Sequence, residues 1–344
     1  MGASYAGGPG DQAPVLDTRR GQVRLVRHMD ERVGTDVARA ARLLEAGELV
    51  AIPTETVYGL AASALDAEAC LRVFEAKQRP FFDPLIVHLA SLEAARGVVA
   101  DLPPAALELA NRFWPGPLTL VLPRSEEVPD VVTSGLETVA VRCPDHPLTR
   151  QLLERLSFPL AAPSANPFGG ISPTTPQHVL DGLGDRVAYV LDGGPCSVGV
   201  ESTIVGWESQ QAVLHRPGGV PLEALEELLG PLGQAATGEQ PVAPGALASH
   251  YAPRTPLELG DLDELLARHG GRQVGVLAFS RPRAASICRV LSTAGELHEA
   301  AHTLFACLRE LDAAGCEVLL AEPVPDEGLG RAINDRLRRA AAPR

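Results

Sequence analysis

Two basic residues separated by one position, Lys77 and Arg79, could together bind a polyphosphate. In an extended segment, side chains two positions apart lie on one face, so both cations could reach one anion. Arginine supplies a bidentate fork and lysine a compact charge, a combination that suits phosphate. Lys77 is also the only lysine of a chain in which Lys and Arg total 30. Because the two cations differ in shape, a lone lysine indicates a place where the wider guanidinium of arginine does not fit. The alternative is a solvated surface pair.

Further polar side chains follow short apolar strands, where the sites of α/β proteins are commonly built. The expected strand 49–52 runs into Thr54-Glu55-Thr56, three adjacent hydrogen-bonding side chains that a packed turn does not need. A helix cap by Thr54 or Thr56 is the alternative interpretation. The segment 163–166 (PSAN) follows a second apolar strand in the same way.

Glycine-containing loops supply backbone N–H groups that can approach a phosphate. They lie at 169–172, 193–194, 199–203 and 215–218. Ordinary turn chemistry explains each loop taken alone. Together with four basic residues in an acidic chain, however, the loops favour an anion site; these residues are Lys77, Arg79, Arg142 and Arg216. The phosphate-binding pattern G-x-x-x-x-G-K-[ST] is absent. The residues by themselves therefore indicate an α/β enzyme that uses phosphate, and no more.

The elements that must position these residues alternate between apolar strands and amphipathic helices, which predicts an α/β fold. The expected helices are 37–46, 67–76, 92–99, 105–112 and 222–229. The expected strands are 49–52, 85–89, 118–122, 138–142, 160–162 and 188–191, with 203–207 and 212–215 pairing as neighbours.

A second unit is expected after a linker. Residues 230–256 are rich in Pro, Gly, Ala and Gln and show no periodicity, which is typical of a functional or disordered loop. Helices at 262–269, 300–314 and 328–341 then alternate with strands at 274–279 and 318–321, predicting a small parallel, Rossmann-like sheet. We thus expect a flexible tail at 1–22, a catalytic domain at 23–229, a linker or lid at 230–256 and a C-terminal domain at 257–344.

Composition narrows the class of protein. Of the 344 residues, 45% are hydrophobic and 21% charged, as in soluble globular proteins. The formal net charge of -13 argues against a protein held to nucleic acid mainly by phosphate contacts. The six cysteines form no C-x-x-C pair, so reduced thiols in the cytosol are expected. No apolar run approaches the length of a membrane span.

The ordered series PTETVYGL, KQRP, PLIVHL, FWPGPLTLVL, VAVR, PSAN, GVESTIV and LHRPGG resembles the YrdC family. The linker segment SHYAP (249–253) and the C-terminal extension are similar to the longer Sua-type members, so the resemblance runs from about residue 37 to about residue 340. It implies a twisted, open, mixed sheet with a large concave cleft, followed by the Rossmann-like domain. It also implies a cytoplasmic synthesis of threonylcarbamoyl-adenylate from L-threonine, bicarbonate and ATP with Mg²⁺, releasing pyrophosphate. Partner proteins would then transfer the threonylcarbamoyl group to a tRNA adenosine beside the anticodon, so that tRNA is an indirect partner.

The resemblance also implies residue roles. Those around the phosphates and the carbamate are Lys77, Arg79, Ser164 and Asn166. The threonine site is Thr56, His88, Arg142, the backbone at Ala162, and Ser202. ATP contacts are Arg79, Asp83, Thr138, Ser164, Ser172, Arg216 and Tyr251, the last folding over the nucleotide from the linker. Asp83 stands where the family commonly has Asn, and a carboxylate near phosphates is repulsive unless it binds metal. No side chain is assigned as a metal ligand.

Two other functions stay open at this stage. His298-Glu299-Ala300-Ala301-His302 matches H-E-x-x-H, which on a helix could bind zinc with Glu299 as the base of a hydrolase. No third ligand is evident, and a solvated helix face is the alternative. A non-catalytic RNA-binding module is the other rival, against which the net charge counts.

Overall fold

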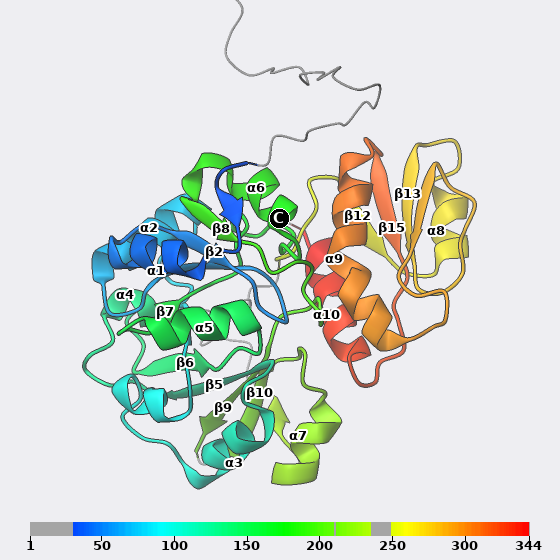
Figure 1. Cartoon of the computed structure of the whole chain (residues 1–344). Helices are drawn as coiled ribbons and strands as arrows, with labels where there is room; N and C mark the ends of the chain where they lie inside the picture. The colour runs from blue at the N-terminus through cyan, green and yellow to red at the C-terminus, as the bar shows by residue number, and fades with distance from the viewer. Residues whose placement is uncertain (1–29, 210, 235–248, 344) are drawn as a thin grey trace, which may run out of the picture.

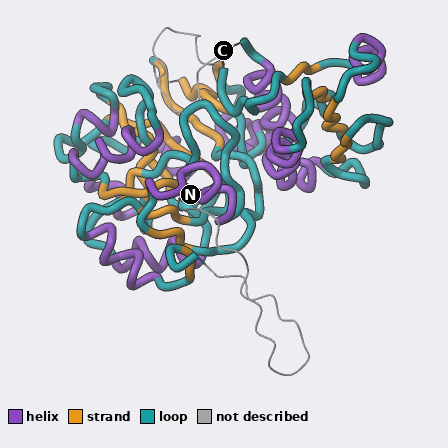
Figure 2. Tube along the Cα trace, turned by 90° about the horizontal axis from the view of Figure 1, so that it is seen from above, coloured by secondary structure: helices purple, strands orange, loops and turns teal. Residues whose placement is uncertain are grey.

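The computed structural model describes residues 30–209, 211–234 and 249–343. The expected tail 1–22 and the greater part of the expected linker 230–256 lie outside the described residues. The described chain forms two lobes, each built on its own β-sheet (Figure 1). The view from above in Figure 2 shows the smaller lobe beside the larger one.

The larger lobe contains a mixed sheet of eleven described strands in the spatial order β1-β8-β2-β3-β7-β4-β6-β5-β9-β10-β11. In chain order they are β1 Val33–Gly34, β2 Val50–Ile52, β3 Gly59–Ser63, β4 Ile86–His88, β5 Leu118–Pro123, β6 Thr138–Arg142, β7 Leu160–Ala161, β8 Tyr189–Leu191, β9 Thr203–Glu208, β10 Gln211–Arg216 and β11 Gly233–Gln234. The sheet contains both parallel and antiparallel pairs of strands. At its centre, strands that are distant in the sequence lie side by side.

Helices cover this sheet and bury their apolar faces against it. They are α1 Val37–Glu45, α2 Ala67–Lys77, α3 Pro104–Phe113, α4 Asp130–Thr133, α5 Pro147–Arg155, α6 Pro176–Leu183 and α7 Leu222–Leu229, with 3₁₀ turns at Glu93–Gly97 and Gly184–Arg186. α1 and α2 are preceded by the N-cap residues Asp36 and Asp66, whose side chains accept hydrogen bonds from backbone N–H groups of the first turn. The core is rich in Leu, Val and Ala, as the low aromatic content requires.

The end of α2 corrects the expectation that Lys77 and Arg79 lie in an extended segment. Lys77 is the last residue of the helix, and Gln78 caps it in the left-handed conformation with φ 54°. The period-two argument for a shared face therefore does not hold here. The bond from the Arg79 N–H to the Phe74 carbonyl belongs to the helix cap as well.

The smaller lobe is a four-stranded, all-parallel sheet in the order β12-β15-β13-β14. Its strands are β12 Leu257–Leu259, β13 Val274–Ala278, β14 Ile287–Val290 and β15 Val318–Ala321; its helices are α8 Leu262–Arg268, α9 Leu297–Ala313 and α10 Gly330–Ala341. α8 packs on one face, whereas α9 and α10 pack on the face toward the larger lobe (Figure 1). This is the expected Rossmann-like arrangement.

The two lobes share one hydrophobic cluster. Val57, Ile171 and Val200 of the larger lobe pack with the buried side chains of α9 and α10, and Tyr251 belongs to the same cluster. The contact is close at Gly199, where a side-chain Cβ in place of the glycine hydrogen would lie 2.5 Å from the α9 backbone. The lobes are thus joined by tightly packed apolar surface.

Most predicted elements are confirmed to within two or three residues, including the pairing of β9 with β10. The expected helix 92–99 is instead a short 3₁₀ turn. Nine elements were not predicted: β1, β3, α4, α5, α6, the 3₁₀ turn Gly184–Arg186, β11, β12 and β14. β3 reads Gly-Leu-Ala-Ala-Ser, whose weak strand propensity is overridden by burial between β2 and β7. No helix within the described residues is long and apolar enough to span a lipid bilayer.

Candidate active site

A pocket opens where several central strands of the larger sheet end. β4 and β6 are parallel and in register, with His88 opposite Arg142, so the last residues of both strands reach the same edge. β5 runs antiparallel to β6 and places Thr119 opposite Arg142. The pocket is lined by Thr54, Thr56, Val57, Gly59, Arg79, Ile86, His88, Arg142, Ala162, Pro163, Ser164, Glu201, Ser202, Arg216, His250 and Tyr251.

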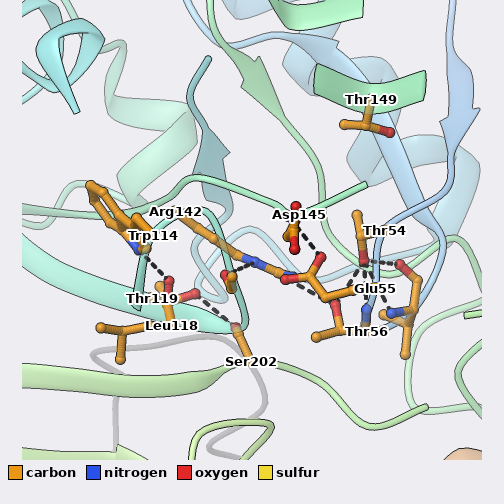
Figure 3. A network of polar contacts seen from close by, with 12 residues as sticks. Thr54, Glu55, Thr56, Trp114, Leu118, Thr119, Arg142, Asp145, Thr149 and Ser202 are labelled. Atoms are coloured by element: carbon orange, nitrogen blue, oxygen red, sulfur yellow. Dashed lines mark hydrogen bonds and ion pairs between the residues drawn. The ribbon is translucent and has the colours of Figure 1, made fainter. Parts of the chain in front are cut away.

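Arg142 is held in the pocket by a buried network (Figure 3). Its Nη2 forms an ion pair with Glu55 Oε1 at 2.6 Å, and its Nη1 donates to Thr56 Oγ1 at 2.9 Å. Glu55 Oε2 in turn accepts a hydrogen bond from the Asp145 N–H at 3.1 Å. Thr54 Oγ1 lies 2.8 Å from Thr56 Oγ1. The guanidinium is therefore fixed in one orientation, as a bidentate group for a carboxylate must be.

A second group of polar contacts joins β5 and β10 to Ser202, the residue before β9. Thr119 Oγ1 lies 2.7 Å from Ser202 Oγ. Arg216 Nη2 donates to the Ser202 carbonyl at 3.0 Å and to Ser202 Oγ at 3.2 Å. Burial lowers the pKa of Arg216, yet an arginine stays charged at neutral pH. Arg79, Arg142 and Arg216 together make the pocket a site for anions.

His88 is a neutral side chain in this pocket. Burial, and then the nearby charge of Arg142, lowers its pKa from 6.5 to about 3. Its Nδ1 lies 3.2 Å from the Ile86 carbonyl oxygen. An imidazole that is uncharged at neutral pH can bond a polar ligand without adding charge to the site.

Arg79 and Asp83 form a buried ion pair at 2.9 Å. Arg79 also donates from Nε to the Asp83 carbonyl and from Nη2 to the Pro84 carbonyl. Burial raises the pKa of Asp83 against the opposing effect of Arg79. Of the two, only Arg79 lines the pocket. Asp83 thus faces its arginine, and a direct contact with ATP stays a prediction.

Lys77 does not line the pocket. It is 1% exposed, and its Nζ donates to the backbone carbonyl of Ser164 at 2.5 Å and to that of Asn166 at 2.6 Å. Burial, with the charge of Arg79, moves the pKa of Lys77 well below its usual range. In this structure the lysine supports the PSAN loop through these two backbone carbonyls, and a direct contact with phosphate stays a prediction.

The other predicted residues divide into two sets. Ser164, Ala162, Ser202 and Tyr251 line the pocket. Asn166 instead donates from Nδ2 to the carbonyls of Pro167 and Gly170. Ser172 and Thr138 are also absent from the lining; Ser172 bonds Glu201.

Thr138 lies at the opposite end of β6 from Arg142, roughly 13 Å away at the usual rise of a strand. Its expected role as an ATP contact stays a prediction.

The described C-terminal end of the linker, from residue 249 on, lies against one side of the pocket. His250 and Tyr251 are both buried, with ring centres 4.2 Å apart, and Tyr251 has a positive φ of 62°. The Ala252 N–H donates to the Gly169 carbonyl at 2.8 Å, which fastens this segment to the larger lobe. The Tyr251 hydroxyl is buried and has no hydrogen-bond partner within the described part of the chain.

Two acidic residues were missed by sequence reasoning. Glu55 and Glu201 were noticed only as parts of motifs, and neither was given a role. Glu55 pairs with Arg142, and Glu201 is a buried carboxylate in the pocket wall. The only sequence signal was their position among hydroxyl side chains at strand ends.

The H-E-x-x-H segment is part of α9 and forms no metal site. Glu299 accepts a hydrogen bond from the Ser292 hydroxyl at 2.5 Å, beside the start of the helix. Among the described residues no group of three or more His, Cys, Asp or Glu is arranged to hold a metal ion. The zinc hydrolase interpretation is therefore not favoured.

Fold and pocket together define an α/β protein whose pocket is lined by three buried arginines and is suited to small anionic molecules. Two sequence families match the chain. One, Sua5_yciO_yrdC, described as "Telomere recombination", matches residues 42–218. The other, Sua5_C, described as "Threonylcarbamoyl-AMP synthase, C-terminal domain", matches residues 220–342.

Curated relatives and a solved structure agree with these matches. The threonylcarbamoyl-AMP synthase of Pyrococcus abyssi is 43% identical over 88% of this chain and 93% of its own length. That of Bacillus subtilis is 41% identical over 90% of this chain and 93% of its own length. The crystal structure of P. abyssi Sua5 complexed with L-threonine matches with a TM-score of 0.84 and 43% identity, covering 89% of this chain and 94% of that one. The chain belongs to the threonylcarbamoyl-AMP synthase family, in its long Sua-type form, which confirms the resemblance seen in the motifs.

Proposed function

We propose that the protein uses ATP to convert L-threonine and bicarbonate into threonylcarbamoyl-AMP and pyrophosphate, as a nucleotidyltransferase. The observation that carries this proposal is the pocket that Arg142, held by Glu55 and Thr56, lines together with Arg79 and Arg216. A similar protein has been solved with L-threonine. One arginine suits an amino-acid carboxylate, and the other two suit a polyphosphate.

In this proposal Arg142 binds the threonine carboxylate. Thr56, Ser202, the neutral His88 and the Ala162 backbone bond the remaining polar groups of threonine, and all of them line the pocket. Because the hydroxyl of threonine would meet buried hydrogen-bonding groups, an amino acid without it would leave them unpaired. Selectivity for threonine follows from that penalty.

ATP lies toward Arg79, Ser164, Arg216 and Tyr251. Lys77 supports this site through the PSAN loop, together with Asn166, whereas contacts from Asp83, Thr138 and Ser172 stay predictions. We treat Mg²⁺ as part of the substrate, arriving on the ATP phosphates, which is how this ion commonly enters sites that hold few carboxylates.

The reaction needs positioning and charge neutralisation more than covalent catalysis. The threonine amine combines with bicarbonate to give a carbamate and water. A carbamate oxygen then forms a bond to the α-phosphorus while the bond to the β-phosphate oxygen breaks and pyrophosphate leaves. In-line displacement of this kind is accelerated by fixing the reactants and neutralising the phosphates. Arg79 and Arg216 supply the positive charge, and no side chain serves as a nucleophile.

The product would serve a tRNA-modification step in the cytoplasm. A mixed anhydride with AMP is an activated acyl donor, so separate transfer proteins would place the threonylcarbamoyl group on the adenosine beside the anticodon. The protein needs no direct contact with tRNA for this role, in keeping with its net charge of -13.

The test is pyrophosphate release from ATP with each amino acid in turn, with and without bicarbonate. We expect release to require L-threonine and bicarbonate together. Equal pyrophosphate release without threonine would contradict the proposed synthase activity. A non-catalytic RNA-binding module would release no pyrophosphate under any of these conditions.

A further inference from the structure

The C-terminal lobe reaches the pocket wall through one buried arginine. Arg336, on α10, is 0% exposed. Its Nε donates to Glu201 Oε2 at 2.8 Å, and its Nη1 donates to the Pro217 carbonyl at 2.9 Å. The guanidinium carbon also lies 5.1 Å from the centre of the Tyr251 ring. A single side chain of the smaller lobe therefore contacts three separate segments, two of which supply pocket-lining residues at these contacts.

Arg336 is paired with two carboxylates: Asp335 beside it on α10, at 2.7 Å, and Glu201 of the larger lobe, at 2.8 Å. Glu201 is the one that faces the pocket. It is buried in the pocket wall, and its Oε1 accepts a hydrogen bond from Ser172 Oγ at 2.5 Å. Burial opposes its ionisation, but the charges of Arg336 and Arg216 outweigh burial and lower the pKa of Glu201. An ionised carboxylate at this place repels a polyphosphate unless a cation is paired with it.

The other two contacts fix groups that face the same pocket. Pro217 directly follows Arg216, so the bond to its carbonyl restrains the segment that carries this pocket arginine. Tyr251 comes from the linker, and its ring lies against the guanidinium, a favourable arrangement for a buried cation. Arg336 thus connects Glu201 of the pocket wall, the segment that carries Arg216, and Tyr251 of the linker.

A second arginine of α10 forms a solvent-exposed ion pair with the larger lobe and serves as a comparison. Arg331 also crosses to the larger lobe, where it pairs with Glu223 at 3.0 Å. Both side chains are more than a third exposed, and Glu223 does not line the pocket. Arg336 differs in its complete burial and in its partners.

We propose that Arg336 is a positioning residue of the nucleotide site, supplied by the C-terminal lobe, which neutralises Glu201 and fixes Arg216 and Tyr251 for binding ATP. The proposal rests on the proposed function, because it assigns ATP to this side of the pocket. It gives the C-terminal lobe a part in catalysis beyond packing.

The experiment uses the full chain and four variants: Arg336→Gln, Glu201→Gln, the double variant of both, and Arg331→Gln as the matched control. Pyrophosphate release is measured while ATP and threonine are varied separately. ATP affinity is also measured by calorimetric titration without bicarbonate, and thermal unfolding is recorded for each protein. The double variant removes both members of the buried pair, which commonly preserves folding better than removing one.

We expect Arg336→Gln to raise the KM and the Kd for ATP by about tenfold or more, with a much smaller change in the KM for threonine. The double variant should recover a substantial part of the ATP affinity, because the repelling carboxylate is then gone. Arg331→Gln should behave as the wild type.

Equal losses of affinity for ATP and threonine in Arg336→Gln, with no recovery in the double variant, would show that Arg336 is only a packing residue and overturn the proposal. Unchanged ATP affinity in Arg336→Gln would overturn it as well. Failure of the proposed function is distinguishable, since the wild type itself would then show no threonine-dependent release.

Discussion

At the scale of single residues, Lys77 shows how a buried charge can act through the backbone. Its ammonium lies between the carbonyl oxygens of Ser164 and Asn166 and is 1% exposed. Ser164 lines the pocket, so the position of the lysine fixes a segment of the pocket wall. The chain's only lysine stands where a compact donor with three N–H bonds fits between two acceptors.

The first prediction is that Lys77→Arg fails even though it preserves charge. The planar guanidinium of arginine is larger than the ammonium of lysine, so it displaces the PSAN loop. A displacement of about 1 Å can reduce turnover on the order of a hundredfold. Because the site is buried, the variant should also unfold at a lower temperature. Turnover and thermal unfolding are compared with Arg72→Lys on the exposed side of α2, expected to resemble the wild type. Wild-type turnover in Lys77→Arg would refute the argument from the solitary lysine.

The second prediction concerns His88 and acid stability. Its pKa of about 3 in the folded protein lies below the usual 6.5, so between these values the unfolded chain binds more protons. The stability of the folded state is therefore unaffected by this residue above about pH 6.5 and falls as the pH decreases toward 3.

His88→Gln should accordingly show a shallower decline in the free energy of unfolding between pH 6.5 and 4, by at most about 1.4 kcal/mol per pH unit. Urea denaturation at several pH values measures it, with His298→Gln on the exposed side of α9 as the control. Parallel curves for His88→Gln and the wild type would contradict the prediction.

At the scale of elements, the buried pair of Glu55 and Arg142 joins the loop after β2 to the end of β6. Both side chains are at least nine-tenths buried. Removing one partner of such a pair leaves the other charge buried without compensation. The pair therefore stabilises the connection between two strands as well as orienting the guanidinium.

The third prediction is that Glu55→Gln lowers the free energy of unfolding by about 3–5 kcal/mol, the usual effect of breaking a buried ion pair. Urea denaturation measures the loss. Asp185→Asn, which removes the exposed partner of Arg32, should have no measurable effect and serves as the control. An equally small change in both variants would show that the buried pair contributes little to the connection.

At the scale of the whole molecule, residues of both lobes and of the described end of the linker surround one pocket. The larger lobe provides most of the pocket lining, whereas the linker supplies His250 and Tyr251 and α10 supplies Arg336 behind the wall. The shared cluster with Val57, Ile171 and Val200 places further apolar surface at the contact between the lobes.

The fourth prediction is that a chain ending at residue 229 loses most pyrophosphate release. It lacks Tyr251 and Arg336, and it exposes the apolar residues that pack against α9 and α10, so its unfolding temperature should fall while unfolding stays cooperative. Activity and circular dichroism melting test both parts. Full activity in the truncated chain would show that linker and C-terminal lobe are dispensable.

The sequence by itself predicted the fold class and most strands and helices, because these follow from local periodicity and from side-chain types along one stretch of chain. The order of the motifs indicated the family, and that resemblance implied the roles of Arg142 and His88.

Tertiary structure alone decided which side chains meet. Arg336 and Glu201 are separated by 135 positions, and Thr56 and Arg142 by 86. Lys77 and Arg79 were predicted to share one face of an extended segment, but Lys77 ends α2 and Gln78 caps the helix in the left-handed conformation. Periodicity indicates that a side chain is buried, yet the partner it finds there depends on how distant strands and two lobes pack together.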